Sequence, residues 1–118
     1  MNNHEQEQEI RPIRGDALYR QEAYIDMEVG EIKCLVPVTV NNVRDTERKM
    51  RFFSSIMIQV GMRPMPVNFE IVADTLALAV DAWPAAAKKA GEEARQKIDD
   101  HIRSSRLVVP SHARQKPN

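Results

Sequence analysis

Two stretches of this chain alternate apolar and polar residues around a glycine, and this pattern constrains the fold more than any other feature. In residues 23–40 the apolar side chains recur at every second position on both sides of Gly30. Residues 54–72 repeat the pattern around Gly61. A period of two is that of a β-strand, and glycine supplies the backbone freedom that a tight turn needs. Each stretch therefore predicts a β-hairpin with one apolar face.

The first hairpin is predicted in a specific register. With Gly30 and Glu31 at the centre of a type II′ turn, four apolar pairs share one face. The predicted pairs are Val29 with Ile32, Met27 with Cys34, Ile25 with Val36 and Ala23 with Val38. Glu28 and Lys33 then form an opposite-charge pair on the other face. Pro37 lacks a backbone N–H, which predicts an edge strand or a bulge at that point.

The second hairpin is predicted with residues 61–64 as a four-residue connection. The pairs that follow are Val60 with Met65, Ile58 with Val67, Ile56 with Phe69 and Ser54 with Ile71. The polar residues 41–49 between the two hairpins predict a loop. Two hairpins with matched apolar faces predict a four-stranded antiparallel sheet.

A helical pattern follows the hairpins. Asp74 and Thr75 have the short side-chain oxygens of a helix N-cap, and apolar residues then recur every three or four positions to about Arg103. Pro84 lies inside this pattern and predicts a kink or a short break. The predicted fold is α+β, with a four-stranded antiparallel sheet followed by a long, Pro-kinked C-terminal helix packed on one face.

The chain is predicted to hold one domain between two tails. Residues 1–22 and 104–118 lack periodicity and are predicted to be mobile, and the second of them is basic. The domain then spans residues 23–103. The apolar tetrad at residues 107–110 in the basic tail either docks onto this domain or is a short motif that adds to a sheet edge of another protein.

The composition excludes several classes of protein. Lys+Arg and Asp+Glu both number 17, whereas a nucleic-acid coat or a polybasic membrane binder carries a basic surplus. Cys34 is the single cysteine, which excludes an intrachain disulfide and is typical of a reducing compartment. The polar, acidic N-terminus differs from a signal peptide, and no apolar run reaches the ~18 residues of a membrane span. We expect a cytoplasmic protein that does not bind membranes.

No combination of side chains predicts catalysis, a cofactor or a metal site. The histidines, at positions 4, 101 and 112, are scattered, and Cys34 is expected on the inward face of a strand. Asp26 and Glu28 are close enough for acid–base work, but Lys33 already offers them a partner. The four glycines are isolated from one another, which excludes a phosphate-binding loop. The chain is therefore expected not to be an enzyme.

Three groups of residues are candidates for binding. Methionine adapts to irregular surfaces and proline stiffens a loop, so the second hairpin tip and the adjoining sheet face are candidates for protein contact. These residues are Met57, Met62, Arg63, Pro64, Met65 and Pro66. The alternative is that they only cover the edge of the core. The loop between the hairpins carries a local basic excess, which makes Arg44, Arg48, Lys49 and Arg51 candidate nucleic-acid contacts.

The alanine-rich half of the helix is a candidate for self-association, since small residues permit close backbone approach. The candidate residues are Trp83, Ala87, Ala90, Gly91, Ala94 and Ile98. The alternative is that this half lies tightly on its own sheet. A domain of this size gains only ~3–5 kcal/mol from a single core, which favours oligomerisation. We expect a homodimer formed through this helix or through an exposed sheet edge.

The resulting functional hypothesis is a small, non-enzymatic protein–protein interaction or adaptor module that self-associates, with a protein partner. Two alternatives stay open. One is a nucleic-acid-associated regulator that uses residues 44–51 and the basic tail. The other is a small-ligand-binding protein with a pocket between sheet and helix, near Trp83, Tyr24 or Cys34.

Overall fold

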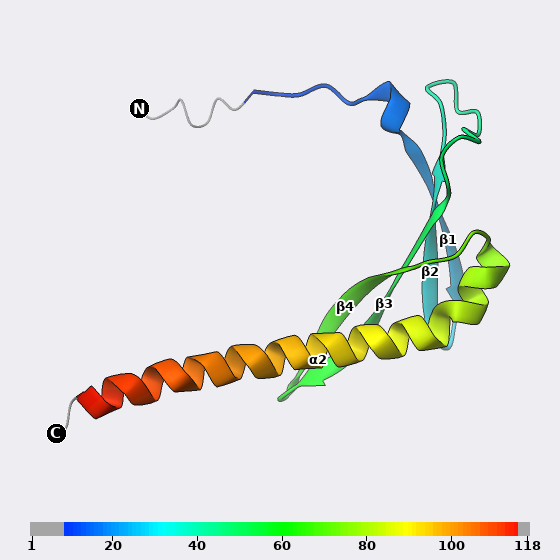
Figure 1. Ribbon diagram of the computed structural model, residues 1–118. Helices are drawn as coiled ribbons and strands as arrows, with labels where there is room; N and C mark the ends of the chain where they lie inside the picture. Colours follow the sequence, from blue (N-terminus) through cyan, green and yellow to red (C-terminus); the bar gives the residue numbers. More distant parts are fainter. Residues whose placement is uncertain (1–8, 116–118) are drawn as a thin grey trace.

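The computed structural model describes the backbone of residues 9–115 and the side chains of residues 9–105 (Figure 1). Its elements are a short 3-10 helix η1 (Gly15–Ala17), the strands β1 (Tyr19–Asp26), β2 (Gly30–Pro37), β3 (Arg51–Val60) and β4 (Arg63–Ile71), and the helix α2 (Leu76–Gln115). The strands form one antiparallel sheet in the order β1-β2-β3-β4, and α2 follows it. The predicted α+β fold of two hairpins and a C-terminal helix is confirmed.

The predicted register of the first hairpin is wrong. Cys34 lies opposite Glu22, five positions from its predicted partner, and Lys33 lies opposite Ala23 instead of Glu28. The turn comprises residues 27–29, because Asp26 Oδ1 accepts hydrogen bonds from the N–H of Glu28 at 2.9 Å and of Val29 at 3.3 Å. Because the shift is odd, the apolar residues of β1 lie on the face opposite to the one predicted.

The predicted register of the second hairpin is displaced by two positions. Val60 lies opposite Arg63, so the connection is the two residues Gly61 and Met62 instead of four. Gly61 has φ of 65° and Met62 does not have a positive φ, which is the pattern of a type II′ turn. An even shift leaves every side chain on its predicted face, and the apolar face of this hairpin is as expected.

Strand β2 lies inside the sheet, so the edge position predicted from Pro37 is wrong. The N–H of Val38 donates to Leu18 at 3.0 Å, which means that even-numbered residues of this strand bond to β1 and odd-numbered ones are directed toward β3. The ladder with β3 ends at Leu35. Pro37 therefore lies past the end of that ladder, where its missing N–H costs no hydrogen bond.

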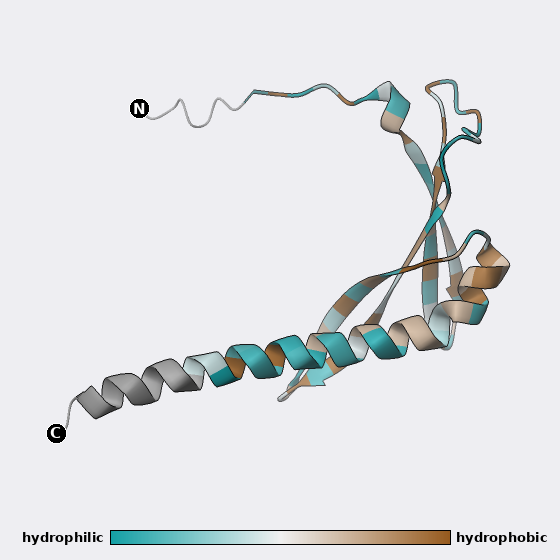
Figure 2. Ribbon diagram, in the orientation of Figure 1, coloured by the Kyte–Doolittle hydropathy of each residue, from teal (hydrophilic) through white to brown (hydrophobic). Residues whose placement is uncertain are grey.

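The core lies between the sheet and the first half of α2. Phe52 and Ile71 are its largest fully buried apolar side chains, and Ala79 of the helix is equally buried. The other members are Ile32, Cys34, Val36 and Val38. Figure 2 shows that the strands alternate in hydropathy and that the apolar part of α2 is its beginning. Only one face of the sheet is therefore covered by a helix.

Helix α2 begins as predicted and ends later. Thr75 Oγ1 accepts a hydrogen bond from the N–H of Leu78 at 3.2 Å, which confirms the N-cap. The helix changes direction in its first turns, in the stretch around the kink predicted at Pro84 (Figure 1). It then continues to Gln115, so the end predicted near Arg103 is wrong. Residues 104–115 do not continue the apolar periodicity of the helix, so the sequence pattern could not reveal this part.

Regular structure extends into both of the segments that are predicted to be tails. Strand β1 begins at Tyr19, inside the segment predicted as an N-terminal tail, and residues 104–115 of the predicted C-terminal tail are helical. The side chains of the tetrad at residues 107–110 lie outside those that the structure describes. In the part of the chain that the structure describes, no helix has an apolar stretch long enough to cross a membrane.

Candidate interaction surface

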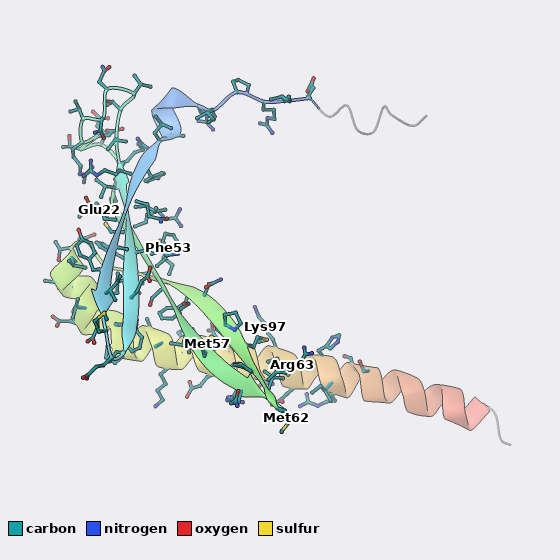
Figure 3. All side chains as sticks on the ribbon, turned by 180° about the vertical axis from the view of Figure 1, so that it is seen from behind. Glu22, Phe53, Met57, Met62, Arg63 and Lys97 are labelled. Carbon is teal, nitrogen blue, oxygen red and sulfur yellow. The ribbon has the colours of Figure 1, made fainter. Side chains whose placement is uncertain are left out.

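The six candidate residues of the second hairpin do not form one patch. We call the part of the second hairpin beyond the β2–β3 ladder, residues Ser55–Asn68, the β3–β4 arm. Met62 is 93% exposed at its turn, and Arg63 lies beside Met62 at the tip (Figure 3). Met57 is 61% exposed on the face away from α2, where it lies opposite Pro66. Met65 is half-buried on the other face, opposite Ile58. The tip and the two faces thus offer separate surfaces.

The sheet face away from α2, here called the open face, carries exposed apolar side chains. Ile25, which the odd register shift places here, is 64% exposed, and Tyr19 and Met57 are also exposed. Phe53 is half-buried because the Arg51 guanidinium lies over its ring, 5.1 Å from the centroid. The open face is therefore apolar at several separate points and has no helix packed on it within the described chain, although the Arg48 guanidinium lies over Tyr19 at one end.

Arg51 is held on the open face by a two-point ion pair with Glu70. Its Nε and Nη2 donate to the two carboxylate oxygens at 2.9 and 2.7 Å. The hydrogen bond from Arg51 lowers the pKa of Glu70, so the carboxylate stays ionised below its usual range. Arg51, a candidate nucleic-acid contact, is thus already paired with a carboxylate of its own sheet.

The other candidate nucleic-acid contacts are similarly engaged. Arg48 donates to Asp45 Oδ2 at 2.9 Å and to the carbonyls of Leu18 and Val38 at 3.0 Å each, and its guanidinium lies 5.0 Å from the Tyr19 ring centroid. Its hydrogen bond to Asp45 lowers the pKa of that carboxyl.

Two further cations of this loop have partners nearby. Arg44 donates to backbone carbonyls of the same loop, and Lys49 lies 3.8 Å from Asp74. The loop and the hairpin tip lie at opposite ends of the sheet, so Arg63 is not part of this basic group (Figure 1). The basic residues therefore serve first to hold the loop on the sheet.

A polar cluster lies on β1 but is poorly suited to acid–base chemistry. Tyr24 donates to Glu22 Oε1 at 2.5 Å, and Arg20 donates to Oε2 at 3.1 and 3.2 Å. The hydrogen bond from Tyr24 lowers the pKa of Glu22, and the same bond raises the pKa of Tyr24. A carboxylate made less basic and a phenol made less acidic are the reverse of what general acid–base catalysis uses.

Cys34 is also unsuited to chemistry. It is buried, its Sγ contacts Met50 Sδ at 3.9 Å, and burial raises the pKa of its thiol. The described residues include no group of three or more His, Cys, Asp or Glu side chains able to hold a metal ion.

The candidate oligomer-forming residues of α2 lie against their own sheet. Ala87 is buried, and a Cβ added at Gly91 would lie only 3.3 Å from Ile56 Cδ1. Trp83 Nε1 donates to Ser54 Oγ at 2.9 Å. Ala90, Ala94 and Ile98 are half-buried. Trp83, Ala87 and Gly91 therefore lie on the sheet, while a hollow of about 640 Å³ remains between β4 and the part of the helix that carries Ala90 and Ala94.

A groove lies between the sheet and the start of α2, close to where a pocket is predicted. It has a volume of about 330 Å³ and is lined mainly by apolar groups. Tyr24 and Trp83 are among its walls, with Leu76 and Val80 from the helix and Ile32 from the sheet. Cys34 does not line it.

Sequence reasoning missed a second hollow, which we call the notch. It has a volume of about 680 Å³ and lies between the β1–β2 turn, residues 25–31, and residues Ser55–Met57 of β3. The notch exists because β2 pairs with β3 only as far as Ser54, after which the two hairpins diverge. Its one sequence signal is the uncharged run at residues 54–60, but the wrong register hid its position.

Comparison of the chain with protein-family models, with curated proteins and with solved structures gave no match.

Proposed function

We propose that this protein is a non-enzymatic protein–protein interaction module that associates with itself. The observation that carries the proposal is the uncovered apolar surface of the sheet. One helix packs on one face, while Ile25, Met57 and Tyr19 stay exposed on the open face and Met62 at the tip. These side chains are exposed at separate points, and the sheet face that carries most of them is not covered by a helix, which leaves room for a second subunit on that face.

The shape of the molecule supports the same proposal. The Cα radius of gyration is 21.3 Å, whereas a compact domain of this length has one of about 13 Å. The β3–β4 arm and the distal part of α2 extend away from the core (Figure 1). An extended chain buries less of its own apolar surface, and a second subunit supplies the missing contacts.

The mass of the native particle tests this proposal. Sedimentation equilibrium of the full chain at low to high micromolar concentration should give a multiple of the 13.5 kDa chain mass. The multiple should persist in high salt, because the exposed surface is apolar rather than charged. A particle of one chain mass at every concentration would contradict self-association.

A second candidate function is the binding of a small apolar ligand in the groove beside Trp83. The observation that favours it is the pairing of Tyr24 and Trp83 in one apolar hollow that opens to solvent. Trp83 is the only tryptophan, so its fluorescence reports on this groove. A saturable change with an apolar metabolite, lost in Val80→Glu but kept in Val72→Glu, would support this function.

A further inference from the structure

The notch leaves part of β3 without a neighbour on one side. The ladder between β2 and β3 joins Ile32–Leu35 to Arg51–Ser54, while the ladder between β3 and β4 continues to Val60. Residues Ser55–Val60 are therefore paired on the β4 side alone. We call their other side the open edge. An unpaired strand edge presents main-chain donors and acceptors to any strand that can reach it.

The hairpin geometry shows which residues direct these groups outward. Val60 and Arg63 flank a two-residue turn and form a hydrogen-bonded pair, so the even-numbered residues of β3 bond to β4. Ser55, Met57 and Gln59 then direct their N–H and C=O groups to the open edge. The carbonyl of Gln59 accepts a hydrogen bond from Arg95 Nη1 at 3.2 Å, as an outward carbonyl can.

The opposite edge of the same arm is closed by proline. On β4 the even-numbered residues are directed outward, and two of these are Pro64 and Pro66, which lack an N–H. They lie directly across the ladder from Gln59 and Met57. The arm therefore has one edge without donors at its tip and one edge that keeps them.

The strand of the open edge carries no charge of its own, although Asp26, Glu28 and Glu31 line the notch beside it and Arg95 bonds to its Gln59 carbonyl. Residues 55–60 are all uncharged and include three β-branched side chains, whereas the free edge of β1 carries Arg20, Glu22 and Asp26. A copy of this segment can therefore lie beside it without like-charge repulsion. The outward N–H and C=O groups belong to odd-numbered residues, so each of these residues must lie opposite an odd-numbered residue of the copy. An antiparallel copy can meet this condition.

We propose that a second copy of this chain adds its β3 to the open edge, antiparallel and about a two-fold axis near Ile58. Met57 of each copy then lies opposite Gln59 of the other, and the two arms join into one sheet with both α2 helices on the same side. A carbonyl has two lone pairs, so Gln59 can keep its bond to Arg95. The inference names the partner and the surface for the self-association proposed above, and it rests on that proposal.

This register would also cover the two most exposed methionines of the described chain, Met62 and Met27. In this register Val60 of one copy lies opposite Ile56 of the other. The turn that follows Val60 therefore reaches the notch of the other copy. Met62 then approaches Ile25, Met27 and Val29, which line the notch and are exposed in the single chain. The contact occurs twice by symmetry, as in any two-fold interface.

A pair of proline substitutions tests the edge. Met57→Pro removes an outward N–H from the open edge, and Asn68→Pro removes one from the β4 edge, while neither removes a bond of the β3–β4 ladder. Sedimentation equilibrium should give a dimer for the wild type and for Asn68→Pro, and a single chain for Met57→Pro. Far-UV circular dichroism shows whether each variant is folded.

A charge exchange gives a second test if a proline variant does not fold. Met57→Lys/Gln59→Lys places lysine opposite lysine, which should raise the dimer dissociation constant by about tenfold or more. Met57→Glu/Gln59→Lys places glutamate opposite lysine and should restore the wild-type value.

The outcomes separate the two proposals. A dimer that survives both Met57→Pro and the double-lysine variant would overturn the edge pairing and leave self-association standing. A wild type with the mass of one chain would overturn both proposals.

Discussion

Ser54 joins the sheet to the helix, and its removal tests whether this contact stabilises the fold. Its hydroxyl donates to the carbonyl of Glu31 at 2.6 Å and accepts from Trp83 Nε1 at 2.9 Å. Ser54 is only 7% exposed, so water cannot replace it freely. In Ser54→Ala both partners lose a bond, and an unsatisfied buried group costs about 1–3 kcal/mol.

The expected loss of unfolding free energy is about 2 kcal/mol. It lies below the sum of two full penalties because Trp83 and Glu31 are only half-buried and regain some hydration. Urea titration followed by the fluorescence of Trp83 gives this free energy, with the protein concentration held fixed so that the proposed self-association contributes equally to every variant.

Ser55→Ala is the matched control. This neighbour is exposed and on the opposite face, so its substitution should change the unfolding free energy by less than about 0.5 kcal/mol. If Ser54→Ala and Ser55→Ala unfold at the same urea concentration, the bridge contributes nothing and the reasoning fails.

Three other predictions concern single residues. Gly91→Ala should stabilise the fold by up to about 1 kcal/mol in thermal unfolding, since only the flexible end of Ile56 must move; a lower midpoint would show that the packing is rigid. Arg51 lowers the pKa of Glu70, so the ion pair stabilises the fold above the unfolded carboxyl pKa and is lost as pH falls through the folded one. Glu70→Gln should therefore flatten the acid limb of the stability curve, and an unchanged limb would count against the pair. Cys34 should react with a thiol reagent only in denaturant, and fast labelling of the native protein would contradict its burial.

The residue pattern predicted the elements of this fold well because period and capping are local properties. The apolar face of the second hairpin was predictable even with the wrong turn, because an even shift preserves faces. The N-cap at Thr75 was predictable because a hydroxyl before a helical stripe has few other uses.

The site was less predictable because it depends on how far two strands overlap. Asp26 closes the first turn through its side chain, and no alternation of apolar residues encodes that bond. The turn sets the start of β2 at Gly30, but β2 pairs with β3 only from Ile32, which leaves Ser55–Val60 paired with β4 alone. The paired roles of Arg48 and Arg51 were equally hidden, since their partners Leu18 and Glu70 are distant in the sequence.

In the edge-paired dimer proposed above, Pro64 and Pro66 would limit further growth. A strand ribbon with two usable edges can accept a copy on each side, and each addition exposes a new edge, so growth has no natural end and produces a fibre. With one edge closed by proline, the second copy consumes the remaining edge and the particle is finite. Replacing both prolines with threonine would convert a closed pair of subunits into the repeating unit of a filament.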